Sequence, residues 1–229
     1  DCFGCDIDYS LGKNFADFAD QFSKDSRYRT ELYKLRRKFM SHADGLIHAD
    51  LHTSNIMASR DKMKVIDMEF AFMGPFGYDL GYLVGNLISQ YCAACFKRFP
   101  SEQSRKQFKA YLLATIQSLI ETYMKTFTLC WEKSVKERYR GQQGLLQSIL
   151  QEVMEDVPGY ASMVNWFRSV SEIPYPDFDI IEDKDAKRNA TVLSLMIDWG
   201  IMFGRYKYQS ADDLIETIIG IEEEFRKSL

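Results

Sequence analysis

Several features that mark specialised protein classes are missing from this chain. Positive charge is not in excess, because 29 Lys and Arg residues stand against 33 Asp and Glu, for a net charge of −4. A surface for nucleic acid would need the opposite balance. No apolar run approaches the roughly 20 residues that cross a bilayer, and the first residues lack the basic and apolar stretches of a secretory signal. We therefore expect a cytoplasmic protein without nucleic acid or membrane partners.

Cysteine is too scarce and too unevenly placed for a secreted disulfide framework. There are five cysteines, an odd number for a chain of 229 residues. Cys2-x-x-Cys5 and Cys92-x-x-Cys95 leave open a four-thiolate zinc site. However, Cys92 and Cys95 fall within an apolar helical pattern, where cysteine usually behaves as a small buried hydrophobe. We therefore favour reduced, structural thiols.

What is present is enough apolar material for a core, at 46% of the residues with 14% aromatic. Apolar residues repeat with helical spacing over most of the chain. The pattern predicts helices at 14–40, 79–99, 102–133, 143–156, 160–169, 185–206 and 210–227. Pro158-Gly159 is expected to end one of them, and the prolines within 173–177 exclude helix interior there. Ser210-x-x-Asp213 resembles a capping box.

Three short apolar runs, 46–48, 56–58 and 64–67, break the helical pattern early in the chain. We interpret them as small strands, with the last two forming a hairpin across 59–63. The fold class expected is therefore α+β and predominantly α, with a small β insertion that carries polar residues on its loops.

Two of these polar residues follow the first strand. Asp50 is placed where a carboxylate can orient an acceptor hydroxyl and take its proton during phosphoryl transfer. The alternative is a carboxylate that only ties down its own loop. Five residues later, Asn55 can bring an amide oxygen to the same point as a Mg²⁺ ligand, or it can simply stabilise a turn.

A second acidic pair ends the third strand. Asp67 and Glu69 stand in an otherwise apolar stretch. In an extended chain their i, i+2 spacing places both carboxylates on one side, where like charges repel unless a cation neutralises them. We therefore predict that Asp50, Asp67 and Glu69 converge on one divalent ion in a single cleft.

The remaining polar residues of this region are assigned supporting roles. Asp79 is expected to cap the following helix and to brace the catalytic loop. His48 is expected to pack beneath that loop. For His52 two interpretations stay open, a substrate-side residue or a turn residue.

Taken together, the pattern H-x-D-x-x-x-x-N at 48–55, followed by I-D-x-E at 66–69, resembles the catalytic core of the aminoglycoside phosphotransferase and choline kinase-like family. The similarity is strongest to the 5-methylthioribose kinases of that family. It rests on the stretches D-L-H-T at 50–53, V-I-D-M-E-F-A-F at 65–72 and G-P-F-G-Y-D-L-G at 74–81, which follow one another in the family's order.

The resemblance implies a single helical lobe over residues 1–229, equivalent to the C-terminal lobe of a protein kinase-like fold. Its catalytic and metal segment would be 46–81 and its substrate-side helices 102–229. The implied site consists of Asp50 as catalytic base, with Asp67, Glu69 and Asn55 at metal positions. The implied reaction is ATP- and Mg²⁺-dependent phosphorylation of a sugar hydroxyl, most closely that of 5-methylthioribose in methionine salvage, by an enzyme that forms a homodimer.

The sequence departs from this family at several positions. Ala49 stands where Gly is usual, and Met68 where Pro is usual. Where the family has twin arginines that bind the sugar, this chain has Phe167-Arg168. A contact to one charged guanidinium is worth roughly 1.5–3 kcal/mol. Arg168 stays a substrate-binding candidate, with a structural role as the alternative, and the acceptor of an aminoglycoside- or choline-type kinase stays open.

The family's nucleotide-binding half is also missing. No G-x-G-x-x-G loop followed by a strand lysine precedes residue 46, and Gly141 and Gly144 come too late. We therefore expect the N-terminal nucleotide lobe to be absent from these residues and the chain alone to be inactive. The absence of an initiator Met favours a chain that begins inside a longer one. A different class of function, a non-catalytic lobe that binds a partner, remains the alternative.

Overall fold

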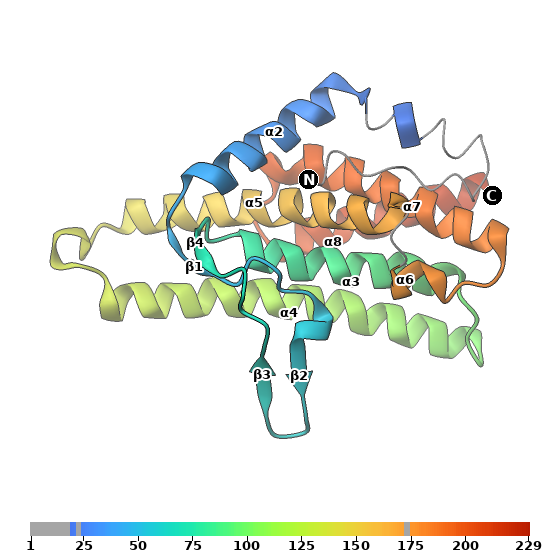
Figure 1. Ribbon diagram of the computed structural model, residues 1–229, viewed down its shortest axis with the longest axis horizontal. Coiled ribbons are helices and arrows are strands. Elements are labelled where there is room, and N and C mark those ends of the chain that lie inside the picture. Colours follow the sequence, from blue (N-terminus) through green and yellow to red (C-terminus); the bar gives the residue numbers. More distant parts are fainter. Residues whose placement is uncertain (1–18, 22–23, 172–174) are drawn as a thin grey trace.

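The computed structural model describes residues 19–21, 24–171 and 175–229. Helices make up most of it, with two small two-stranded sheets on one side (Figure 1), as expected for a predominantly helical α+β chain. The helices are α2 Ser26–Ser41, α3 Tyr78–Phe96, α4 Glu102–Ser134, α5 Gln143–Val170, α6 Pro176–Asp179, α7 Lys184–Gly204 and α8 Ala211–Ser228. In this described part of the chain, no helix is both long and apolar enough to cross a membrane.

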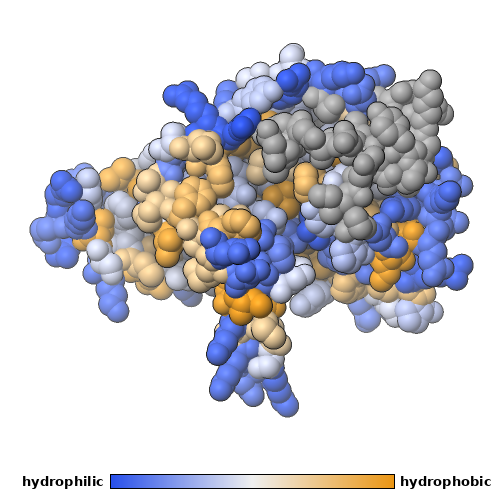
Figure 2. Space-filling model, viewed as in Figure 1, coloured by the Kyte–Doolittle hydropathy of each residue, from blue (hydrophilic) through white to orange (hydrophobic). Residues whose placement is uncertain are grey.

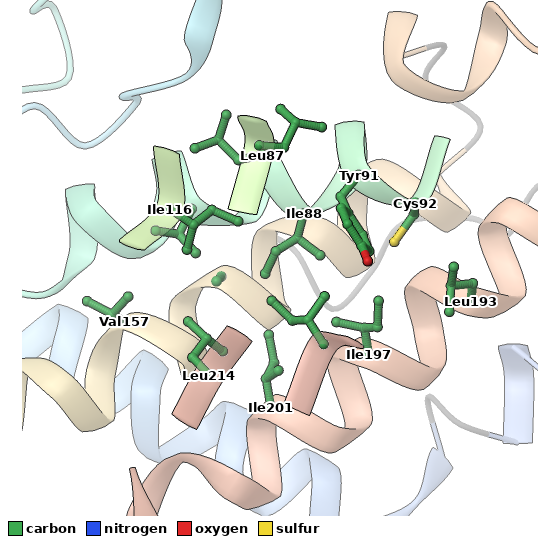
Figure 3. Packing of buried hydrophobic residues seen from close by; sticks show 14 of the residues in the cluster. Leu87, Ile88, Tyr91, Cys92, Ile116, Val157, Leu193, Ile197, Ile201 and Leu214 are labelled. Atoms are coloured by element: carbon green, nitrogen blue, oxygen red, sulfur yellow. The ribbon is translucent and has the colours of Figure 1, made fainter. Parts of the chain in front are cut away.

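Helix α3 is the centre of the molecule and packs against α4, α5 and α7. Side chains of these helices and of α8 meet in one apolar cluster, in which Ile88, Ile116 and Ile201 are fully buried (Figure 3). Cys92 and Cys95 are buried in the same cluster, which confirms their interpretation as small hydrophobes. The partner thiols of the zinc alternative, at positions 2 and 5, lie outside the described residues.

Glycines let α3 approach α5 at backbone distance. A Cβ atom at Gly81 would lie 2.9 Å from the carbonyl oxygen of Val157, and one at Gly85 would lie 2.7 Å from that of Ala161. Both distances are too short for any larger residue, so these two glycines fix how closely the helices cross.

The helical predictions succeeded where the periodicity was long and uninterrupted. The helix predicted at 102–133 corresponds to α4, and the capping box at the start of α8 is present, with the Ser210 N–H donating to Asp213 Oδ2 at 2.9 Å. The predicted break at Pro158 is wrong, because α5 runs through it. Proline removes one helix hydrogen bond, but Pro158 is a buried residue inside α5, and the packing of α5 against α3 and α7 holds the helix together.

The predicted N-terminal helix at 14–40 also differs from the structure. Residues 14–18 and 22–23 are outside the described part, residues 19–21 and 24 are helical, and Asp25 interrupts the helix before α2 begins at Ser26. Asp25 caps it, because its carboxylate accepts hydrogen bonds from the N–H groups of Arg27 and Tyr28.

The strands form two antiparallel pairs. The predicted hairpin is confirmed: β2 Ile56–Ala58 pairs with β3 Met63–Val65, and it projects away from the helices (Figure 1). Its tip is hydrophilic and its base hydrophobic (Figure 2). The other pair joins β1 Gly45–Ile47 to β4 Phe72–Gly74. Strand β4 was not predicted, and it holds both ends of the segment 45–74 together.

Candidate active site

The loop after β1 directs Asp50 toward the helices through an unusual backbone conformation. Ala49 has φ of 67°, in the left-handed region that glycine tolerates best. The carboxylate of Asp79 holds this conformation, because it accepts the N–H of His48 at 2.6 Å and the N–H of Ala49 at 3.0 Å. Asp79 lies in the first turn of α3, so the helix and the loop are fixed to each other at the site.

This arrangement corrects one part of the role predicted for Asp79. The N-cap of α3 is Gly77, without a side-chain cap, so Asp79 does not cap the helix. Its two oxygens serve the loop instead. Burial raises the pKa of the Asp79 carboxyl, and the two N–H donors oppose that rise because they stabilise the charged form.

His48 lies beneath the loop, at 5% exposure. Its Nε2 is 2.8 Å from the carbonyl oxygen of Ile66, and its Nδ1 is 3.3 Å from the N–H of Asp50. These partners assign the tautomer, since Nε2 must donate to the carbonyl while Nδ1 accepts. His48 therefore connects the loop that carries Asp50 to the chain just after β3.

Asn55 makes a second connection of the same kind. It is buried, its Nδ2 donates to the carbonyl oxygen of Asp50 at 3.1 Å, and its own carbonyl accepts the N–H of Ile66 at 3.0 Å. The side-chain contact uses the amide nitrogen and leaves Oδ1 as an acceptor. Asn55 thus stabilises the loop, which is one of its two predicted roles, and the contact does not use Oδ1, the atom that the metal prediction requires.

Asp50 lines a cavity of about 300 Å³ between the loop and the helices. Arg168, from the last turn of α5, lines the same cavity, together with aromatic side chains that include Tyr82 and Tyr175. The Nε2 of His52 is 3.5 Å from Asp50 Oδ2. Asp50 and Arg168, which were proposed from separate sequence motifs, therefore line one hollow, and His52 lies beside Asp50.

Tyr82 is a residue of this cavity that the sequence did not single out. Burial raises the pKa of its hydroxyl, and the negative charge of Asp50 and a hydrogen bond with it add to the rise. The tyrosine thus stays protonated and can donate to the Asp50 carboxylate. A usable signal was its spacing, one helical turn after Asp79, which places both on the same side of the first turn of α3.

Asp177 was also missed, and it holds Arg168. The Nε of Arg168 donates to Asp177 Oδ2 at 2.7 Å, and its Nη2 contacts the same oxygen. Asp177 is buried in α6, a short helix that Pro176 opens. From the sequence, the prolines within 173–177 excluded the interior of a helix there. No local pattern indicated that Asp177 would contact a residue of α5.

Asp67 and Glu69 do not lie as the extended-chain argument predicted. Asp67 has φ of 67°, and Glu69 lies in a turn closed by the N–H of Ala71 and the carbonyl of Met68. The i, i+2 rule for a strand therefore does not apply, and both side chains are exposed. Within the described ranges, no group of three or more His, Cys, Asp or Glu side chains is placed to hold a metal ion. The predicted convergence of Asp50 with this pair on one ion is thus contradicted within the described residues.

The chemical types of these side chains still suit Mg²⁺. Asn55, Asp67 and Glu69 offer hard oxygen ligands, and the hydrogen bonds of His48 and Asn55 to Ile66 tie Asp67 to the Asp50 loop. Mg²⁺ is usually bound by one or two carboxylates, water and phosphate oxygens, without an all-protein cage. A preformed cluster of three carboxylates is therefore not required.

In the described residues, a mostly helical fold carries a hydrogen-bonded loop that presents a carboxylate to a small cavity, which is an arrangement that phosphoryl transfer can use. Residues 9–119 match the model of the phosphotransferase enzyme family. The resemblance found in the motifs is therefore confirmed.

Within that class, the similar proteins are methylthioribose kinases. The enzyme of Geobacillus thermodenitrificans is 32% identical over 198 residues, which cover 86% of this chain and 48% of that protein. Methylthioribose kinase 2 of Oryza sativa subsp. japonica is 31% identical over 203 residues, covering 84% of this chain and 47% of its own length. This chain thus spans about half the length of the curated relatives it matches.

Proposed function

We propose that this chain is the C-terminal lobe of an ATP-dependent small-molecule kinase that phosphorylates a sugar hydroxyl, with 5-methylthioribose as the first candidate acceptor. The observation that carries the proposal is the cavity shared by Asp50 and Arg168, which are far apart in the sequence. The family match and the names of the similar proteins support the same reaction class.

In this mechanism Asp50 is the catalytic residue. It orients the acceptor hydroxyl in the cavity and takes its proton as the phosphoryl group is transferred. Tyr82 and His52 contact its carboxylate and fix its direction. Arg168 donates hydrogen bonds to oxygens of the acceptor from the opposite wall. Most of the rate enhancement comes from holding the acceptor in line with the phosphoryl group.

Mg²⁺ would be held by Asn55, Asp67 and Glu69 together with the phosphates of ATP. When bound, the ion neutralises charge that develops on the phosphate oxygens. The loop that carries Asn55 is the one that carries Asp50, and the hydrogen bond from Asn55 Nδ2 keeps the two residues in register. The chain's own contribution is therefore to connect the loop of Asp50 and Asn55 to the chain that carries Asp67.

A second lobe that binds the nucleotide would face the segment 45–74. Many apolar side chains of this segment and its hairpin are exposed, namely Leu46, Met57, Met63, Val65, Ile66, Met68, Phe70 and Met73. Exposed apolar surface on this scale is typical of a face that another domain covers. We expect the lobe described here to bind ATP weakly and to turn over slowly by itself. The resemblance also supports a homodimer.

The test is a transfer assay on the full-length protein with Mg²⁺ and ATP against methylthioribose, other pentoses, an aminoglycoside and choline. Phosphorylation of one sugar, lost in Asp50→Asn with the circular dichroism spectrum and melting temperature unchanged, is the expected result. The loss should reach about 10²–10⁴-fold, the range for a positioned general base. Full turnover in that variant would remove Asp50 from the mechanism. A folded protein that neither transfers phosphate nor binds ATP would support the non-catalytic alternative.

A further inference from the structure

The cavity holds one cation and one catalytic carboxylate, and these two groups are not paired with each other. Asp50 and Arg168 line the same hollow, yet the guanidinium of Arg168 is bound elsewhere, by Asp177. Opposite charges facing a common cavity attract strongly when water is limited. Other contacts of Arg168 must therefore keep its guanidinium away from Asp50.

These contacts join residues from three helices. Asp177 of α6 accepts Nε and Nη2 of Arg168 with one oxygen, and its other oxygen accepts the side-chain N–H of Gln90 from α3. The side chain of Asp177 is 5% exposed and that of Arg168 is 11% exposed. Because both oxygens of this buried carboxylate accept hydrogen bonds, Asp177 is held in place and holds Arg168 with it.

The remaining side of the guanidinium is fixed by an aromatic ring. The central carbon of Arg168 lies 4.5 Å from the ring centre of Tyr175, and Phe167 packs edge-on to the same ring at 5.9 Å. The carboxylate thus fixes one edge of the guanidinium and the tyrosine one face. Neither Nε nor Nη2 is available to a ligand, but the contacts with Asp177 do not use Nη1.

We propose that Asp177 is a positioning residue that holds Arg168 against the cavity wall, away from the Asp50 carboxylate and ready for an acceptor oxygen. This inference rests on the proposed kinase function. Because a guanidinium that paired with Asp50 would block the acceptor hydroxyl, the contact with Asp177 protects the catalytic residue as well as the binding residue.

The first test is kinetic and uses Asp177→Asn in the full-length protein. This variant keeps the shape of the side chain and removes its charge. The KM for the acceptor should rise and kcat should fall, each by about tenfold or more, as expected for hydrogen bonds to charged groups. Adding Arg168→Gln should restore much of kcat, because the cation that pairs with Asp50 is gone, while KM stays high.

A matched control comes from a buried carboxylate outside the cavity. Glu222 is likewise buried, and it accepts from two cations, Lys109 and Arg226. Glu222→Gln should lower the melting temperature without a KM increase and without rescue by Arg168→Gln. Loss of stability alone can therefore not imitate the expected pattern. An unchanged acceptor KM in Asp177→Asn, or a double variant with no more kcat than Asp177→Asn, would overturn the proposal.

The second test does not depend on turnover. The Nε–H resonance of Arg168, assigned by its absence from Arg168→Lys, should exchange slowly with water in the unmodified protein and in Glu222→Gln. It should be broadened by exchange in Asp177→Asn. If no acceptor is phosphorylated, the proposed function fails, and this resonance decides by itself whether Asp177 fixes Arg168. A resonance that is equally protected in all three proteins would contradict the positioning role.

Discussion

The helical core and the strand-bearing segment 45–74 are held together by different forces. In the core, side chains such as Ile197 and Ile201 are fully buried, and apolar packing supplies the stability. In the segment, Met63 is 69% exposed and Phe70 is 59% exposed. Ile47 of β1 is buried in a second apolar cluster, but the exposed part of the segment is fixed by hydrogen bonds, from His48 to Ile66 and from the loop to Asp79 of α3.

This difference separates stability from activity. The core supports α3, and α3 presents Asp79 to the loop, so the core acts on Asp50 through a few hydrogen bonds and through the packing of Ile47 and Ala49. A substitution in the core should therefore lower the free energy of unfolding, whereas one at an exposed side chain of the segment should change turnover or partner binding with little effect on folding.

The largest difference between the two regions is expected from apolar truncation. Ile201→Ala leaves a cavity in the packed cluster and should lower the free energy of unfolding by about 4 kcal/mol. Met63→Ala removes an exposed side chain of the hairpin and should change the free energy of unfolding by less than about 0.5 kcal/mol. Urea unfolding of both variants in one buffer measures the contrast. Similar losses for the two would mean that the hairpin is part of the core.

An ionic cluster at the edge of the core gives the next largest effect. Burial opposes ionisation of Glu222, but hydrogen bonds from Lys109, Tyr91 and Arg226 outweigh it and lower its pKa to about 2. Glu222→Gln leaves two cations without their partner and should cost about 3 kcal/mol at pH 7.

The same cluster predicts the sign of a pH dependence. The pKa of Glu222 in the folded state lies below its ordinary value of 4.5. The unfolded chain therefore binds the proton first, and the stabilisation is complete above about pH 5 and lost as the pH falls toward 2. Thermal melts at pH 7 and pH 3 should show a smaller difference between the unmodified protein and Glu222→Gln at the lower pH. A difference that grows on acidification would contradict the assigned pKa.

Glycine substitutions test how tightly the core is packed at the site's supporting helix. Gly85→Ala places a Cβ atom 2.7 Å from the carbonyl oxygen of Ala161 and should cost about 2 kcal/mol by overpacking. The same change at Gly220, in α8, meets no atom within 4 Å and should gain about 0.5–1 kcal/mol of helix propensity. Opposite shifts in melting temperature are expected. A gain in both variants would show that α3 can move away from α5.

The two regions also differ in how much of their structure could be predicted from the sequence. Long periodic helices such as 102–133 were predictable because their signal is local and repeated, and the hairpin was predictable from its turn. Strand β4 was not, because Phe72–Gly74 is recognisable only by its pairing with β1. The helix through Pro158 was missed because tertiary packing overrides a local breaker.

The site shows the same division. Asp50 and Arg168 were found as separate motif residues, and the structure shows that they share a cavity. Asp177 was missed because its role depends on a contact with a different helix. The expected placement of Glu69 beside Asp67 was wrong because it assumed extended chain where the structure has a turn. Residue types at fixed spacing carry chemistry, but long-range contacts decide which of them act together.

The smallest effect concerns the strain in the loop that carries Asp50. Ala49 adopts φ of 67°, which costs a non-glycine residue about 1–2 kcal/mol. Ala49→Gly removes that strain and adds about 0.4–1 kcal/mol of unfolded-state entropy, so a net gain of about 0.5 kcal/mol is expected. Turnover should stay within about twofold, because glycine adopts the same conformation and Asp79 keeps its two N–H donors.

The control for this change is Ala58→Gly in strand β2, an exposed position without positive φ. There glycine brings only its flexibility and should destabilise by about 0.5–1 kcal/mol. Differential scanning calorimetry of the two variants should therefore give shifts of opposite sign within one segment of the chain. If Ala49→Gly lowers the melting temperature as much as Ala58→Gly does, the loop is relaxed as it stands. The hydrogen bonds from His48 and Ala49 to Asp79 would then align Asp50 without having to hold a strained backbone in place.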